Sequence, residues 1–341
     1  MLSHRNLLAM TISTLADVYR FEPEDIVLHA APLSHGSGVY MLATIACGCT
    51  NIINDAQGFD PDAVTALIER ERVTAIAFVA PTMIVRLLDA PTTRDTSSLR
   101  CVIYGGAPIH VDHSRAAVDR FGPIFVQIYG QGEAPMTISC LRARDHLMDD
   151  PAVLSSAGTV RTDVELKIVG DDGAPLPVCE IGEIAVRGDV VMSGYWNDPI
   201  ATAKALRDGW LYTGDIGRLD PAGRVVLLDR KYDTIISGGI NIYPREIEDV
   251  LVRHPAVDEA VVFGTPDPVW GENVTAAVVL VAGGTADAGE IVEFCKAHLA
   301  SFKKPKIVHF LPELPRNAYG KVLRRDLRER FSQESPARLG Q

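Results

Sequence analysis

Short apolar, β-branched runs alternate with helical stretches between residues 25 and 128, and this alternation constrains the fold more than any other feature. The runs have the length and composition of buried strands, and turn residues bound them. The predicted strands are Ile26–Ala31, Asn51–Ile53, Ala75–Val79, Cys101–Tyr104 and Ile124–Ile128. Strands that alternate with helices form a parallel sheet covered by helices, and such sheets bind ligands at the carboxyl ends of their strands.

Capping signals locate the helices of this region. Asp60 is a candidate N-cap, Pro61 suits the first helical turn, and Val64 and Ile68 then fall on one face. An amphipathic helix is predicted over residues 6–19, where the apolar run is too interrupted for a signal peptide.

After Gly158 the pattern changes to short strands separated by turn clusters, which predicts an antiparallel section. A compact α+β unit of about 100 residues follows from residue 233. The elements predicted are strands over 164–169, 183–187, 225–228, 257–263 and 273–281, helices over 244–254 and 287–300, and a basic helix after residue 321.

The fold class expected is therefore α/β. A large N-terminal lobe, residues 1–229, holds the parallel sheet and the antiparallel section, and a hinge at 230–232 joins it to a small, mobile α+β C-terminal domain, residues 233–331. Residues 332–341 are expected to be a tail.

The composition excludes several classes of protein. Lys and Arg total 33 against 44 Asp and Glu, so the formal charge is −11 and nucleic acid is not expected as a partner. The six cysteines include no CxxC pair, which predicts free thiols and a cytoplasmic protein. No stretch approaches the about 20 apolar residues that span a bilayer.

Glycine clusters follow two of the predicted parallel strands. Gly105 and Gly106 come directly after one strand, where they would let a flat ligand approach the backbone or would form only a turn. Tyr129 follows the strand that ends at Ile128, and Glu133 lies four residues further on. Glu133 is a candidate ligand for a hard cation, with a solvated loop carboxylate as the alternative.

Three further clusters carry candidate functional side chains. Asp215 follows a glycine turn and suits vicinal hydroxyl groups, and Arg230 could share the same sugar or form a structural ion pair. Gly238 and Gly239 form a loop before a helix, and Lys321 at the tip of a Pro/Gly turn could carry charge to a developing oxyanion or phosphate.

In order and spacing, eight motifs resemble those of AMP-forming acyl-CoA synthetases, a superfamily that includes the adenylation domains of peptide synthetases and the luciferases. The resemblance runs from residue 2 to about residue 330. The motifs are PLSHG (32–36), YGGAP (104–108), YGxxE (129–133), GEIxVRG (182–188), YTGD (212–215), DRK (229–231), the Gly-Gly loop leading into Glu246, and PRNxxGK (315–321).

The resemblance implies a two-step ligation of a small carboxylic acid, fatty or aromatic, to coenzyme A. A carboxylate attacks the α-phosphate of ATP to give an acyl-adenylate and pyrophosphate, and a thiol then displaces AMP. The expected cofactors are ATP/AMP, Mg²⁺ and coenzyme A, and a homodimer is left open.

The resemblance also implies site roles. Glu133 would bind Mg²⁺, Lys321 would act in the first step only, and the Gly238–Gly239 loop would approach the thiol after the small domain rotates. The residues implied to hold the nucleotide are Gly105, Gly106, Ala107, Pro108, Gln127, Tyr129 and Gly130, with Asp215 and Arg230 at the ribose.

The acid is expected near seven residues of the large lobe. Among these, His35 would be an aromatic gate or a satisfied loop histidine, and apolar Val39 and Met136, with Val79 nearby, suit an acyl or aryl group as well as they suit core packing. The predicted pocket residues are His35, Gly36, Val39, Tyr40, Thr82, Tyr104 and Met136.

The sequence departs from the family pattern at its start. A phosphate-binding loop with one lysine precedes the segment that matches Leu2–Asn6 in the family, whereas the first lysine here is Lys167. We therefore expect a fragment that forms acyl-adenylate poorly. Gly132 replaces a usual Thr, and Tyr232 occupies the hinge position where Asp or Lys is common.

Two other readings remain open. One is an amino-acid adenylation domain that loads a carrier protein, although no counterpart of its specificity Asp lies within residues 33–40. The other is a non-catalytic remnant that binds nucleotide.

Overall fold

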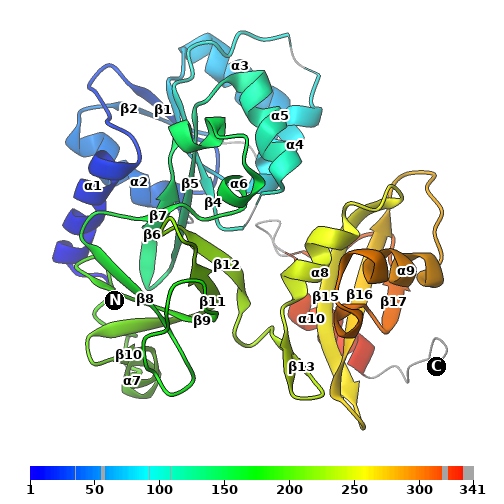
Figure 1. Ribbon diagram of the computed structural model, residues 1–341. Helices are drawn as coiled ribbons and strands as arrows, with labels where there is room; N and C mark the ends of the chain where they lie inside the picture. Colours follow the sequence, from blue (N-terminus) through cyan, green and yellow to red (C-terminus); the bar gives the residue numbers. More distant parts are fainter. Residues whose placement is uncertain (35, 55–57, 92, 108, 317–321, 333–341) are drawn as a thin grey trace. The chain divides into compact units, whose positions relative to one another are not determined.

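The computed structural model describes the chain except residues 35, 55–57, 92, 108, 317–321 and 333–341 (Figure 1). The chain forms two compact units. The first comprises Met1–Thr213 and Gly217–Leu227, and the second comprises Gly214–Ile216 and Leu228–Gln341.

A seven-stranded sheet is the centre of the first unit, in the order β2-β1-β3-β4-β5-β6-β7. Strands β1 to β5 pair in parallel, whereas β6 and β7 pair antiparallel. The strands are β1 (Ile26–His29), β2 (Thr50–Ile53), β3 (Ala75–Val79), β4 (Cys101–Gly105), β5 (Phe125–Gln131), β6 (Ala134–Leu141) and β7 (Thr159–Val160). The parallel sheet expected from the sequence is confirmed.

Helices cover both faces of this sheet (Figure 1). On one face lie α3 (Pro61–Glu71), α4 (Pro81–Asp89) and α5 (Val111–Phe121), and on the other lie α1 (His4–Asp17) and α2 (Gly36–Ala46). The predicted cap of α3 is confirmed, because the Asp60 carboxylate accepts a hydrogen bond from the amide of Asp62 at 2.9 Å. Short helical segments η1 (Ala143–Leu147) and α6 (Pro151–Leu154) follow β6.

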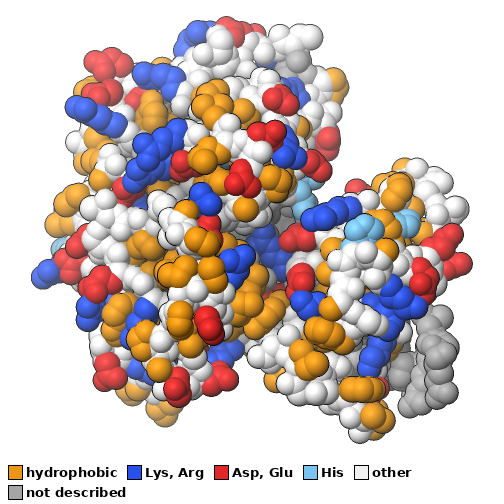
Figure 2. Space-filling view, viewed as in Figure 1, with side chains coloured by type: hydrophobic (Ala, Val, Ile, Leu, Met, Phe, Trp, Pro, Cys, Tyr) orange, Lys and Arg blue, Asp and Glu red, His pale blue; other side chains and the backbone are white. Residues whose placement is uncertain are grey.

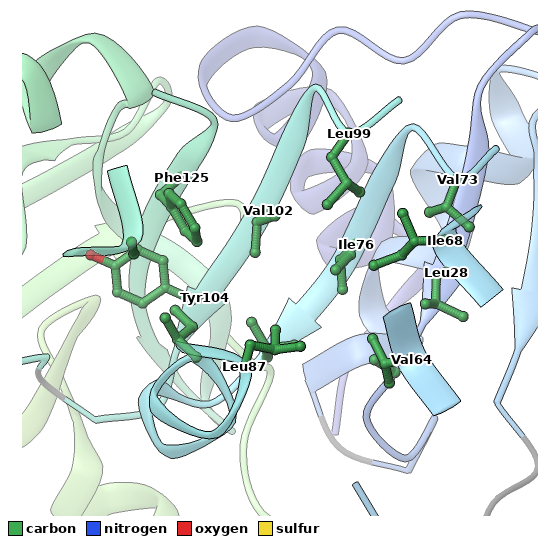
Figure 3. Close-up of a cluster of buried hydrophobic side chains, with 14 of the residues drawn as sticks. Leu28, Val64, Ile68, Val73, Ile76, Leu87, Leu99, Val102, Tyr104 and Phe125 are labelled. Atoms are coloured by element: carbon green, nitrogen blue, oxygen red, sulfur yellow. The ribbon is translucent and has the colours of Figure 1, made fainter. Parts of the chain in front are cut away.

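Side chains from β1, β3, β4 and β5 pack with those of α3, α4 and α5 in one buried cluster (Figure 3). This cluster includes Val64 and Ile68 of α3, the two apolar positions predicted to share a face. Burial of such aliphatic side chains contributes about 1.5–3 kcal/mol each relative to exposure. The sheet edge that carries the glycine clusters is therefore held by a packed scaffold.

The predicted antiparallel section is a five-stranded sheet. Its strands follow the order β10-β11-β9-β8, and β12 pairs with β11. The strands are β8 (Val164–Val169), β9 (Gly182–Gly188), β10 (Leu206–Arg207), β11 (Trp210–Leu219) and β12 (Val225–Arg230), and α7 (Pro199–Ala205) precedes β10.

The second unit is the α+β unit predicted from the sequence. Its sheet has the order β14-β13-β16-β15, and β17 pairs with β16 in parallel. The strands are β13 (Ile235–Ser237), β14 (Ile240–Ile242), β15 (Val257–Asp267), β16 (Gly271–Leu280) and β17 (Ile307–Phe310), and the helical segments are α8 (Pro244–Leu251), α9 (Ala288–His298), η2 (Ser301–Lys303) and α10 (Arg324–Ser332).

Separate clusters hold the helices of the second unit to its sheet. Ile247 and Leu251 of α8 and Ile291 of α9 are buried in one cluster, and Leu327 and Phe331 of α10 are buried in another. Figure 2 shows acidic and basic side chains interspersed over the face in view. Among the helices that the structure describes, none has the length and apolar character needed to cross a bilayer.

Candidate functional site

The carboxyl ends of the parallel strands in the first unit carry the predicted glycine clusters. Gly105 ends β4, and Gly106 follows with a φ of +81°, a conformation that favours glycine. A Cβ atom built on Gly105 would lie 2.5 Å from the carbonyl oxygen of Ile128, so the neighbouring strands approach too closely for a larger residue. Backbone atoms rather than side chains therefore form the surface at the end of β4, and such a surface suits a flat ligand.

The ring of Phe78 connects three of the predicted site residues. A Cβ on Gly36 would lie 2.1 Å from Met136 Cε and 3.0 Å from the Phe78 ring. A Cβ on Gly106 would lie 3.7 Å from Phe78 Cζ. The structure therefore brings Gly36, Gly106 and Met136 together around Phe78, a residue that the sequence did not single out.

Met136 has an unusual backbone conformation for its residue type. Its φ is +61°, in the left-handed region. The predicted strand that ends at Ile128 instead continues to Gln131 and turns into β6. A Cβ on Gly130 would lie 2.5 Å from the Met136 amide nitrogen, so glycine is required where this hairpin passes the Met136 backbone.

Tyr104 and Gln127 do not share this face of the sheet. The Tyr104 hydroxyl donates to Gln127 Oε1 at 3.1 Å and lies 2.9 Å from Nε2 of His146, and all three side chains are buried. Figure 3 shows Tyr104 in the buried cluster near Leu87 and Phe125. Burial raises the pKa of Tyr104 and lowers that of His146. This group packs the core rather than facing Phe78.

The other predicted pocket residues differ in exposure. Tyr40 is buried in the cluster with Phe78, Val39 is half-buried one residue earlier on α2, and Thr82 is exposed near the start of α4. Val79 points to the opposite face from Phe78, into the cluster that holds Tyr104. Ala107 is exposed after Gly106.

Glu133 lies in the turn of the β5–β6 hairpin. Its carboxylate is half-buried and accepts a hydrogen bond from the Tyr195 hydroxyl at 2.6 Å. Burial and this hydrogen bond raise the pKa of Tyr195 to about 12. Among the described residues, no three His, Cys, Asp or Glu side chains form a metal-binding group. A single carboxylate is compatible with a Mg²⁺ site, because Mg²⁺ commonly takes its remaining ligands from substrate phosphates and water.

Asp215 and Arg230 are brought together within the second unit. Arg230 Nε lies 2.8 Å from Asp215 Oδ1, and the Asp215 side chain is 8% exposed against 35% for Arg230. A carboxylate and a guanidinium fixed at this distance supply an acceptor and several donors to a sugar. The two strands that position them are β11 and β12.

Gly238 and Gly239 form the turn between β13 and β14. Their φ values are +60° and +80°, as a two-residue hairpin turn requires. A Cβ on Gly238 would lie 2.7 Å from Cε3 of Trp270, and the Gly238 amide donates to the Trp270 carbonyl at 2.8 Å. Three further predicted residues, His35, Pro108 and Lys321, lie outside the described residues.

Comparison with known proteins assigns the family. Residues 1–196 match the model described as AMP-binding enzyme, and residues 246–321 match that of the AMP-binding enzyme C-terminal domain. The chain belongs to the AMP-binding enzyme family. This result confirms the resemblance that the ordered motifs indicated.

Several members of the AMP-binding enzyme family are similar to the chain along nearly all of its length. A feruloyl-CoA synthase of Amycolatopsis sp is 40% identical over 335 residues, which cover 97% of the chain and 66% of the relative. A medium/long-chain-fatty-acid–CoA ligase of Mycobacterium tuberculosis is 39% identical over 336 residues, which cover 95% of the chain and 58% of the relative. The chain thus spans 58–66% of the length of these relatives.

Solved structures of the family also match. An amide bond synthetase from Marinactinospora thermotolerans aligns with a TM-score of 0.89 and 37% identity, over 96% of the chain and 66% of that protein. The o-succinylbenzoate CoA synthetase of Bacillus subtilis, solved in complex with its acyl-adenylate intermediate, aligns with a TM-score of 0.86 and 35% identity, over 100% and 67%. These matches confirm the α/β architecture.

Proposed function

We propose that the chain acts in the ATP-dependent ligation of a fatty or aromatic carboxylic acid to coenzyme A. The observation that carries the proposal is the alignment of the chain, over 100% of its length, with a CoA synthetase solved with an acyl-adenylate. A thiol is favoured as the acyl acceptor because curated relatives at 39–40% identity are named CoA ligases or synthases. The amide bond synthetase at 37% identity makes an amine acceptor the second candidate.

The residues proposed to contact the nucleotide are assigned within each unit by itself. Gly105, Gly106 and Ala107 would border the adenine, since bare backbone at the edge of β4 allows a flat ring to approach. Asp215 and Arg230 would hold the ribose hydroxyls through charge-assisted hydrogen bonds. Most of the catalytic effect in nucleotidyl transfer comes from such positioning.

The chemistry of the first step requires charge stabilisation at the phosphates. A carboxylate oxygen of the acid forms a bond to the α-phosphorus of ATP, and the bond to pyrophosphate breaks. Glu133 would hold Mg²⁺ at the phosphates, and Lys321 would carry its charge to the α-phosphate. In the second step the thiol sulfur attacks the acyl carbon and AMP leaves.

The acid would lie against Gly36, Phe78 and Met136. The Phe78 ring and the Met136 thioether offer an apolar surface of adaptable shape. Because Gly36 has no side chain, the Met136 thioether packs directly against the first residue of α2. This group of residues supports a fatty or aromatic acid over a charged one.

Binding of AMP by isothermal titration calorimetry tests the ribose assignment. We expect D215N to weaken AMP binding about 10- to 150-fold, because a hydrogen bond to a charged group contributes about 1.5–3 kcal/mol. E165Q is the matched control, since Glu165 also pairs with an arginine, Arg187, at 2.6 Å but on exposed positions of β8 and β9. Equal AMP affinity in D215N and the unaltered chain would contradict the assignment.

A second experiment separates the two half-reactions. We expect K321A to lose acyl-adenylate formation but to retain thioester formation from supplied acyl-adenylate and coenzyme A. Thioester yield is followed by mass spectrometry with a panel of fatty and aromatic acyl-adenylates. Equal loss of both half-reactions would remove the role proposed for Lys321.

A further inference from the structure

Arg161 is a buried cation beside the proposed acid site. It lies between β7 and β8 with 2% of its surface exposed. Nη1 donates to the carbonyl oxygen of Met136 at 2.5 Å, and Nη2 lies 3.3 Å from the hydroxyl of Thr14. Both hydrogen-bond acceptors are neutral, and although the Asp17 carboxylate is within electrostatic reach, burial of the guanidinium costs desolvation free energy that burial of an apolar residue would not. We therefore expect the buried guanidinium to serve a function, and its hydrogen bond to Met136 is the contact that can supply one.

The bond to Arg161 holds a strained part of the backbone. Met136 adopts a φ of +61°, which a residue with a side chain populates only where its surroundings fix it. The nearby backbone of Gly130 restricts the amide side of Met136, and Arg161 fixes its carbonyl side. Together these two contacts restrain the backbone of Met136 at its amide nitrogen and at its carbonyl oxygen.

The backbone conformation of Met136 in turn directs its side chain. Met136 Cε lies 2.1 Å from where a Cβ on Gly36 would be, so the thioether covers the first residue of α2. One helical turn later, Tyr40 is buried with no hydrogen-bond partner for its hydroxyl among the described residues. Burial raises the pKa of Tyr40, and Arg161 opposes that change, so the guanidinium is within electrostatic reach of α2.

We propose that Arg161 is a positioning residue that holds Met136 over Gly36 and thereby limits the length of the acyl group that the site accepts. The inference rests on the proposed function, because it takes Gly36 and Met136 as the acid site. Arg161 acts through the carbonyl of Met136 and does not touch the acid. Its loss frees Met136 to adopt an ordinary φ and moves the thioether away from Gly36.

The test measures binding of adenosine ligands to the full chain by calorimetry. The probes are AMP and stable N-acylsulfamoyl adenosines that carry a short, a medium or a long straight acyl chain. The measured quantity is the ratio of the dissociation constants for the long and the short acyl probe. We expect R161M to change this ratio about tenfold in favour of the long probe and to leave AMP affinity within about twofold. R161K keeps a donor and is expected to retain part of the selectivity of the unaltered chain.

R142M is the matched control. Arg142 Nη2 pairs with Asp17 at 2.8 Å, and none of the hydrogen bonds found among the described residues joins Arg142 to Met136. We expect R142M to leave the ratio unchanged. M136G keeps the backbone conformation without strain because glycine adopts a φ of +61° readily. M136G is therefore expected to bind the long acyl probe. Adding R161K to M136G is expected to leave the ratio of the long-probe and short-probe dissociation constants unchanged.

The outcomes distinguish failure of the inference from failure of the proposed function. If R161M or R161K weakens AMP and all acyl probes together, or R142M shifts the ratio equally, Arg161 supports the fold only and the inference is overturned. If circular dichroism shows that R161M does not fold, R161K and the comparison of M136G with M136G/R161K test the inference instead. If neither AMP nor any acyl probe binds the unaltered chain, the proposed function fails, and the inference fails with it.

Discussion

Arg324 at the start of α10 is expected to be a main determinant of stability in the second unit. Its Nη1 lies 3.1 Å from Asp229 Oδ1 and 3.1 Å from Asp233 Oδ2, and its Nη2 lies 2.7 Å from Glu248 Oε1. The Asp229 side chain is only 4% exposed. One guanidinium therefore pairs with three carboxylates from different segments, and R324M would leave these carboxylates without this shared partner.

The magnitude follows from burial. Removing one partner of a buried ion pair costs about 3–5 kcal/mol, because the remaining charge is left uncompensated. We expect R324M to lower the free energy of unfolding of the second unit by this amount at pH 7. For a unit of about 100 residues, the melting temperature would fall by more than about 10 °C.

The pH dependence has a definite sign. Burial raises the pKa of Glu248 and of Asp229 even with Arg324 in place, so both carboxyl groups take up protons more readily in the folded state. A group with a raised folded pKa stabilises the fold at low pH, and that stability is lost as the pH rises through the folded pKa. The cost of R324M is therefore expected to shrink as the pH falls from 7 towards 5.

Hydrogen exchange measured by mass spectrometry gives the assay, because peptides of the second unit report its opening free energy separately. R325M is the control, since Arg325 is the next residue on α10 but is 85% exposed and, within the described part of the chain, forms an ion pair with Glu329 alone. We expect R325M to cost at most about 0.5 kcal/mol. The double variant R324M/E248Q should regain part of the loss. Equal effects of R324M and R325M, or no recovery on adding E248Q, would refute the reasoning.

Three further predictions concern the first unit. G158A should lower its free energy of unfolding in urea by more than about 4 kcal/mol, because the new Cβ would lie 1.9 Å from a backbone oxygen at a φ of +72°, whereas G223A, at a φ of +77° with open space, should cost about 1 kcal/mol. Burial lowers the pKa of His29 in the folded state, so the unfolded chain takes up a proton at a higher pH than the folded chain does. The free energy of unfolding in urea should therefore fall as the pH drops below about 6.5, and H29Q should reduce this pH dependence. Y195F removes the 2.6 Å hydrogen bond to Glu133 and should cost about 1.5 kcal/mol in the same assay, while an unchanged midpoint would mean that solvent replaces this bond.

Local signals in the sequence were sufficient for much of the fold. Val164–Val169 was predicted with the bounds that the structure gives, and Asp60 caps α3 as expected. These elements depend on residues close in the sequence, because the alternation of apolar and polar residues along a strand and side-chain capping of a helix are local effects. The β5–β6 hairpin was not predicted, because Pro135 is unusual inside a strand and the run from Ala134 therefore does not resemble one.

The candidate site depended more on contacts between distant residues. The Arg161 bond to Met136 joins positions 25 residues apart, and no spacing rule predicts it. Residue type and motif order predict that Asp215 and Arg230 share one sugar, with a structural ion pair of Arg230 as the alternative, and the structure places their side chains 2.8 Å apart. Tyr104 was expected near the acid, but alternation along β4 turns its side chain to the other face.

The register of β3 explains why Phe78 was overlooked. Strict alternation puts Ala75, Ala77 and Val79 on one face and sends Phe78 to the other. The pairing of β3 with β4 shifts between Ile76 and Val79, which is the signature of a bulge. Ala77 and Phe78 consequently both point to the α2 face, and Val79 joins the opposite cluster. Because a bulge is a property of two paired strands, only the structure reveals that an aromatic ring, and not a valine, lies between Gly36 and Gly106.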